Sequence, residues 1–124
     1  MKEVLFTERA PKAIGPYSQA TATDTTVYTS GQLGIDVATG ALAQGVENQA
    51  HCAMKNIGEL LKTKGLSYGD IVKTTIFMKD LADFATVNAV YASYFAGEYP
   101  ARSTIQVAAL PLGGLVEVEC VAVR

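Results

Sequence analysis

Leu115-Val116-Glu117-Val118-Glu119-Cys120-Val121 alternates apolar and acidic side chains near the end of the chain. Successive side chains of a β-strand point to opposite faces of a sheet, so the apolar residues share one face and the two glutamates share the other. This stretch decides the fold. It predicts a strand over residues 115–123, with one face packed on a core and the other left for a different use.

Two helical segments interrupt a chain that otherwise favours strands. Apolar residues recur at helical spacing over residues 46–64, and Gly65 follows as a stop. A second helix is expected to begin at about Asp80, whose carboxylate can cap it, and to end at Gly97. Alternating or β-branched runs predict strands at residues 4–6, 17–22, 25–30, 70–78, 102–108 and 115–123.

The order β-β-β-α-β-α-β-β predicts an α+β fold in which two helices cover one face of a six-stranded mixed sheet. Residues 1–124 are expected to form one domain. On the strand after the second helix, we expect Ile105 and Val107 to pack on the helices. Arg102, Thr104 and Gln106 are then expected on the opposite face, with the glutamates, toward partner subunits and a ligand.

Composition favours self-association and argues against a nucleic-acid partner. Hydrophobic residues make up 49% of the chain and charged residues 18%, against about a quarter in an average domain. The net charge is −2 and the pI about 5.3, with no basic cluster. No stretch is long enough to cross a membrane, and the apolar run at residues 4–6 is too short for a secretory signal, so we expect a cytoplasmic protein.

The ligands and nucleophiles of common catalytic sites are sparse. Cys52 and Cys120 are far apart and are expected to be free thiols, and His51 is the only histidine. A zinc site and a nucleophile–histidine pair are therefore not expected. Gly31, in the run Ser30-Gly31-Gln32 at the end of a strand, would let a ligand approach the backbone.

Four other residues have two interpretations each. Arg102 is either a surface ion-pair residue or a two-pronged ligand for a carboxylate. Glu117 and Glu119 either protect an exposed strand edge, or at least one has a partner or a catalytic role, because a carboxylate in an apolar strand is costly. Asn88 lies on the apolar stripe of the second helix, where it would either tie a strand to the helix or contact a ligand.

Several separated segments, in the same order, resemble the RidA family, also called YjgF, along the whole chain. The matching segments are Ala13-Ile14-Gly15-Pro16-Tyr17-Ser18-Gln19, Thr29-Ser30-Gly31-Gln32, Gly69-Asp70-Ile71-Val72-Lys73-Thr74-Thr75, residues 83–88, Pro100-Ala101-Arg102-Ser103 and Val116-Glu117-Val118-Glu119.

The resemblance implies a homotrimer with a Bacillus chorismate-mutase-like fold. Three sheets would form a central barrel, with the helices outside and the sites in clefts between subunits. It also implies hydrolysis of 2-imino acids such as 2-iminobutanoate and 2-iminopropanoate, which pyridoxal-phosphate enzymes release, to 2-keto acids and ammonia. No cofactor or metal is implied.

The resemblance also assigns roles to individual residues. Arg102 would bind the substrate carboxylate, and Glu117 would position or activate the attacking water. The backbone around Ser103 would meet the imine end of the substrate. Thr104 would also lie near the substrate, although many family members have cysteine there, so thiol chemistry is not available at this position. The pocket would be shaped by Tyr17, Ser30, Gly31 and Asn88.

Other functions are carried forward as alternatives. A non-catalytic member of the family could bind small carboxylates in a regulatory role, or act as a chaperone through protein contacts. RNA cleavage or inhibition of translation has been attached to relatives, but the acidic balance of the chain favours it least.

Overall fold

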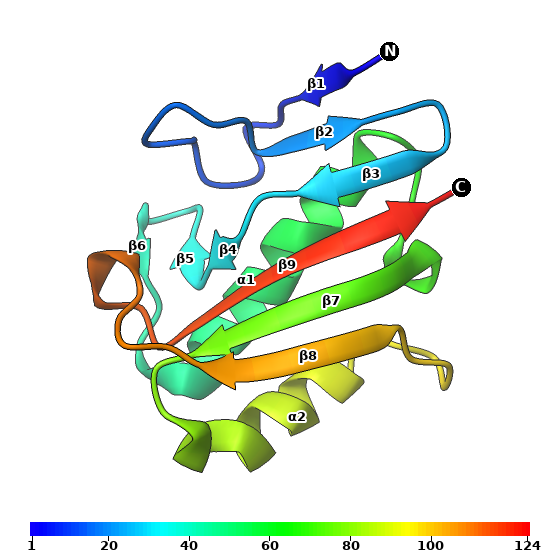
Figure 1. Cartoon of the computed structure of the whole chain (residues 1–124). Coiled ribbons are helices and arrows are strands. Elements are labelled where there is room, and N and C mark those ends of the chain that lie inside the picture. Colours follow the sequence, from blue (N-terminus) through cyan, green and yellow to red (C-terminus); the bar gives the residue numbers. More distant parts are fainter.

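The computed structural model describes all residues, 1–124, and is built on one sheet (Figure 1). Neighbouring strands follow the order β1 (Glu3–Leu5), β2 (Ala20–Ala22), β3 (Thr26–Thr29), β9 (Val116–Val123), β7 (Ile71–Met78) and β8 (Ala101–Gln106), and β4 (Gln32–Leu33) also pairs with β9. β7 and β8 are parallel, and the other pairs are antiparallel. A separate hairpin joins β5 (Ile35–Asp36) to β6 (Ala41–Leu42).

β9 lies inside the sheet, between β7 on one side and β3 and β4 on the other. Its alternation is as predicted: Val116, Val118 and Cys120 are at most 3% exposed, whereas Glu117 and Glu119 are half-buried on the other face. A strand with two paired edges has no backbone groups left unsatisfied, so its side-chain pattern alone decides which face meets the core.

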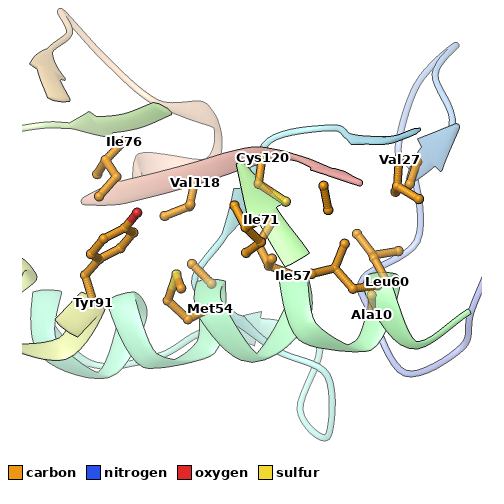
Figure 2. Close-up of a cluster of buried hydrophobic side chains, with 14 of the residues drawn as sticks. Ala10, Val27, Met54, Ile57, Leu60, Ile71, Ile76, Tyr91, Val118 and Cys120 are labelled. Atoms are coloured by element: carbon orange, nitrogen blue, oxygen red, sulfur yellow. The ribbon is translucent and has the colours of Figure 1, made fainter. Parts of the chain in front are cut away.

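Both helices lie on the same side of the sheet. α1 (Gly45–Lys62) passes behind the strands in Figure 1, and α2 (Phe84–Ala92) packs on α1 beside β8. The side chains of Met54, Ile57 and Leu60 point from α1 at the strands and are at most 2% exposed (Figure 2). Three 3₁₀ turns, η1 (Tyr68–Asp70), η2 (Leu81–Asp83) and η3 (Pro111–Gly113), connect the elements. Neither helix combines the length and apolar content that a bilayer crossing needs.

The predicted order of elements is confirmed, with differences at the ends. The six expected strands are the six of the main path, and β4 and the β5–β6 hairpin are additional two-residue segments. The second strand begins at Ala20 rather than at residue 17. Asp80 does cap, accepting a hydrogen bond from the Ala82 amide at 2.8 Å, but it caps η2, and α2 ends at Ala92 rather than at Gly97.

The predicted faces of β8 are wrong. In the parallel register Arg102 lies beside Thr74, and Thr104 lies beside Ile76. Thr74 and Ile76 are at most 1% exposed on the helix side, so Arg102, Thr104 and Gln106 are on the helix side too. Ile105 is 47% exposed on the other face of the sheet, which no helix covers and which is called the open face below. The prediction assumed that the apolar side chains of this strand face the chain's own core, and here they do not.

Candidate functional site

A cleft of about 560 Å³ lies on the open face of the sheet, beside the first half of β9 and the link between β3 and β4. Glu117 and Glu119 of β9 line it from one side, and Tyr17, Ser30 and Gly31 line it from the loops before and after β2 and β3. The cleft therefore gathers four of the residues that the sequence singled out, together with the second glutamate.

Glu117 packs directly against the backbone of Gly31. A Cβ atom at position 31 would lie 2.7 Å from the carboxyl carbon of Glu117 and 2.8 Å from its Oε2. Burial raises the pKa of Glu117 above its ordinary value, and the nearby charge of Glu119 raises it further. A carboxyl group with a raised pKa is a stronger base than an ordinary carboxylate, which suits a group that accepts and returns a proton.

Side-chain hydrogen bonds hold the loop that forms the far wall of this cleft. The amide of Gln19 is 3% exposed; it accepts from the Thr7 backbone N–H at 2.9 Å and donates to the Pro11 carbonyl at 2.8 Å. The Ser30 hydroxyl donates to the Ser18 carbonyl at 2.6 Å. Gln19 was not predicted as a site residue. The signal was available, because a buried amide at the start of a strand must find partners.

Arg102 lines a second, smaller hollow of about 320 Å³ between β8 and α2. Its guanidinium carbon lies 5.0 Å from the ring centre of Tyr91 and 5.6 Å from that of Phe84, which is a cation–π geometry with both rings. The only ion pairs in the chain are Lys62–Glu59 and Lys64–Glu3. The surface ion-pair interpretation of Arg102 is therefore wrong, and its N–H donors are free for a ligand.

The neighbours of Arg102 are partly as expected. Asn88 lines the same hollow, half-buried, and its side chain makes no hydrogen bond, so it does not tie a strand to the helix. The Thr104 hydroxyl oxygen, two residues along the same strand face, is buried without a hydrogen-bond partner. The Ser103 side chain is exposed on the opposite face, where the Lys73 ammonium donates to its hydroxyl at 3.0 Å.

The two hollows lie on opposite faces of one sheet. Glu117 is in register with Phe77 on the open face, and Arg102 is in register with Thr74 on the helix face. One chain thus brings Glu117 together with Tyr17, Ser30 and Gly31, and brings Arg102 together with Asn88. It does not bring Arg102 and Glu117 into one cleft.

Two aromatic residues in contact with Arg102 were not among the predicted site residues. Phe84 and Tyr91 were assigned only to the apolar stripe of the second helix. They are seven residues apart, which is two helical turns, so they lie on one face of α2. Phe84 is 41% exposed, and neither that exposure nor its contact with Arg102 has a signal in the sequence.

The thiols and the histidine show no sign of nucleophilic chemistry. Cys52 and Cys120 are both free. Burial raises the pKa of Cys120 to about 12, and burial also raises the pKa of Cys52, so both remain protonated thiols near neutral pH. The His51 Nδ1 lies 2.8 Å from the Tyr94 hydroxyl, which joins α1 to the end of α2. No cluster of three or more His, Cys, Asp or Glu side chains could hold a metal ion.

The chain is similar over its length to proteins of one family. A family model described as endoribonuclease L-PSP matches residues 7–124. A relative from Mus musculus, 2-iminobutanoate/2-iminopropanoate deaminase, is 50% identical over 125 residues, which cover 100% of this chain and 93% of the relative.

Solved structures agree with this similarity. RidA from the Antarctic bacterium Psychrobacter sp. PAMC 21119 has a TM-score of 0.96 and 43% identity, covering 98% of this chain and 99% of that one. E. coli TdcF with bound serine has a TM-score of 0.95 and 43% identity, covering 98% of both chains.

Proposed function

The chain belongs to the endoribonuclease L-PSP family, in which RidA deaminases are found, and on that premise we propose that it hydrolyses 2-imino acids to 2-keto acids and ammonia. The observation that carries the proposal is the unpaired guanidinium of Arg102. It is stacked on two rings and has no carboxylate partner in the chain, so it is ready to grip the carboxylate of a small acid.

The chemistry needs little beyond a held substrate and a placed water. The carbon of the C=N bond is already electrophilic, so water adds to it, the C–N bond of the resulting adduct breaks, and ammonia leaves as the C=O bond forms. Glu117 takes one proton from the attacking water and passes it to the imine nitrogen, which gives the neutral adduct. It then takes the proton of the adduct's hydroxyl group and passes it to the amine nitrogen, which leaves as ammonia. The raised pKa of Glu117 suits both steps. Thr104 lies on the same strand face as Arg102, but its hydroxyl oxygen is buried and outside the lining of the hollow, so we place it behind Arg102 rather than against the substrate in one chain.

The proposal requires two chains for each site. Because Arg102 and Glu117 lie on opposite faces, a second copy has to bring its Glu117 cleft to the Arg102 hollow of the first. The open face supports such packing, since Tyr28 and Ile105 are 49% and 47% exposed there. We propose a homotrimer, with Tyr17, Ser30 and Gly31 from one subunit facing Asn88 and Arg102 from the next, and with the Ser103 backbone beside the imine.

The same proposal covers organisation and location. One hydrophobic cluster of 22 buried residues runs from Leu5 to Ala122, which supports a single RidA-like domain over residues 1–124. The two free thiols suit a reducing compartment, and we place the protein in the cytoplasm.

The test is a coupled assay. A threonine dehydratase generates the imino acid in situ, and the release of 2-keto acid is followed with and without this protein. Wild-type protein is expected to accelerate release, and Arg102→Ala is expected to lose the effect because the substrate carboxylate has no other cation in the hollow. Acceleration that survives unchanged in Arg102→Ala contradicts the assigned role, and no acceleration by wild type contradicts the function.

A second candidate is a regulatory member of the family that binds small carboxylates without turnover. The solved relative with bound serine favours keeping it, since serine also presents a carboxylate. Calorimetric binding of a 2-keto acid by a wild-type protein that shows no hydrolysis would select this candidate.

A further inference from the structure

Beneath Arg102, two buried hydroxyl groups are joined between helix and sheet. The oxygens of Tyr91 on α2 and Thr74 on β7 are 2.7 Å apart, and the two residues are 5% and 1% exposed. Figure 2 shows Tyr91 rising from the helix layer with its hydroxyl oxygen directed at the strands. A hydrogen bond in such a dry setting fixes the tilt of the ring, because water cannot replace either partner.

The same ring lies against Arg102. Thr74 and Arg102 are direct neighbours in the β7–β8 register, so the hydroxyl bond and the guanidinium are held by adjacent strands. The ring centre is 5.0 Å from the guanidinium carbon, and Phe84 adds a second ring at 5.6 Å. Contact through the face of the guanidinium leaves its N–H edges open to a ligand.

We propose that Tyr91 is a positioning residue for Arg102: its hydroxyl, tied to Thr74, sets its ring and thereby the plane in which the guanidinium receives the substrate carboxylate. This inference rests on the proposed role of Arg102. Arg102 makes no ion pair that could orient it instead, so the rings are its only fixed support among the contacts of the chain. A long side chain held in one plane loses less freedom when it binds a two-pronged ligand.

The inference predicts a particular kinetic signature. Tyr91 acts through the carboxylate grip, which the substrate uses equally in its ground state and in the transition state. Weakening such uniform binding raises KM and leaves kcat nearly unchanged. A substitution that merely destabilised the fold would lower the amount of active protein and thus the apparent kcat instead.

The experiment compares Tyr91→Phe, Thr74→Val and the double variant. Each single variant is expected to raise the KM for the imino acid, and the Kd for 2-oxobutanoate measured by calorimetry, by about 3- to 10-fold with kcat within about twofold. The double variant is expected to have the KM of either single one, because both remove the same bond. The double variant should also have a higher unfolding midpoint than Thr74→Val, since it leaves no buried hydroxyl without a partner.

The matched control is Tyr68→Phe. Tyr68 also donates a partly buried hydrogen bond, to the Met54 carbonyl at 2.8 Å, but it makes no cation–π contact with Arg102. Its KM is expected to equal that of wild type. If wild type turns over the imino acid and binds 2-oxobutanoate while Tyr91→Phe and Thr74→Val keep the wild-type KM and Kd, the positioning role is overturned and the proposed function stands. A wild-type protein that does neither overturns both.

Discussion

Glu117 packs against Gly31, so a substitution at position 31 can test whether activity depends on the position of the Glu117 carboxyl group. In Gly31→Ala the new Cβ would occupy the place of the Glu117 carboxyl, which is the flexible end of its side chain and can move aside. We expect an unfolding midpoint close to that of wild type and a loss of activity of about 10²-fold, because the carboxyl is displaced from the water.

The control for this variant is Gly69→Ala. A Cβ at position 69 would come no closer than 4.0 Å to its nearest neighbour, the Ser67 hydroxyl. That variant should keep full activity in the coupled assay. Full activity in Gly31→Ala as well would remove Glu117 from the water-binding position.

Replacing Glu117 is expected to stabilise the fold and to lower the activity. Its pKa in the folded protein is raised by burial and by Glu119, so folding is favoured most when it is protonated. That contribution to stability is lost as the pH rises from the ordinary pKa of a glutamate through the raised pKa of Glu117. Glu117→Gln should therefore raise the unfolding midpoint at pH 7 relative to wild type, with a smaller difference at pH 4, and should lower activity by about 10²- to 10⁴-fold.

Thermal melts at the two pH values and the coupled assay check this prediction together. Glu59→Gln is a suitable control because Glu59 pairs with Lys62 and is not among the residues that line the cleft. A Glu117→Gln protein that melts below wild type at pH 7 would show that the ionised carboxylate is stabilised in the fold.

Single residues differ in how far the sequence could place them. The alternation in β9 correctly put Glu117 on the face away from the core, because a buried central strand leaves no other choice of register. The same reasoning failed for Arg102. Alternation divides a strand into two faces but does not say which face the core covers. β8 exposes Ile105, while its Arg102 lies against two aromatic rings on the helix side.

Among the elements, the segment between β7 and α2 carries a cap that can be measured. Asp80 accepts the Ala82 amide at 2.8 Å at the start of η2, just before the helix that supports Arg102. Asp80→Ala is expected to cost about 1 kcal/mol of unfolding free energy in urea titrations, with KM and kcat unchanged. Asp83→Ala is the control, because Asp83 makes no capping hydrogen bond and should cost less. An equal loss in both variants would contradict the cap.

Long elements were predictable and short ones were not. α1, β7 and β9 have enough residues for their periods to be read. β4, β5 and β6 have two residues each, too few for any period. β4 forms because β9 pairs with it, β5 and β6 pair with each other, and the Asn56 amide of α1 donates to the Leu33 and Ile35 carbonyls. α2 ends at Ala92 because the backbone N–H groups of the next three residues bond carbonyls three residues back instead of four, although Tyr94 and Phe95 continue to pack on the core.

At the scale of the whole molecule, the high hydrophobic content predicted association, and the open face of the sheet supplies the surface for it. Tyr28, Val72 and Ile105 are each at least 45% exposed there. No local sequence pattern encodes the number of subunits, because that number depends on the angle between the sheets of neighbouring subunits, which a single chain does not define. It came from the resemblance and stays part of the proposal.

The central claim is that each site takes its Arg102 from one subunit and its Glu117 from another. Arg102→Ala and Glu117→Gln proteins, each inactive alone, are to be mixed, unfolded, refolded together and assayed for imine hydrolysis. Light scattering should first give about three times the 13.1 kDa mass of one chain for both variants and for the mixture. A functional interface needs Arg102 from one subunit and Glu117 from its neighbour. In an equimolar mixture that assembles at random, each of the two subunits is the required variant half of the time, so about one interface in four is functional. The equimolar mixture is expected to recover about a quarter of wild-type activity. A mixture as inactive as its two components would show that Arg102 and Glu117 of different subunits do not share a site.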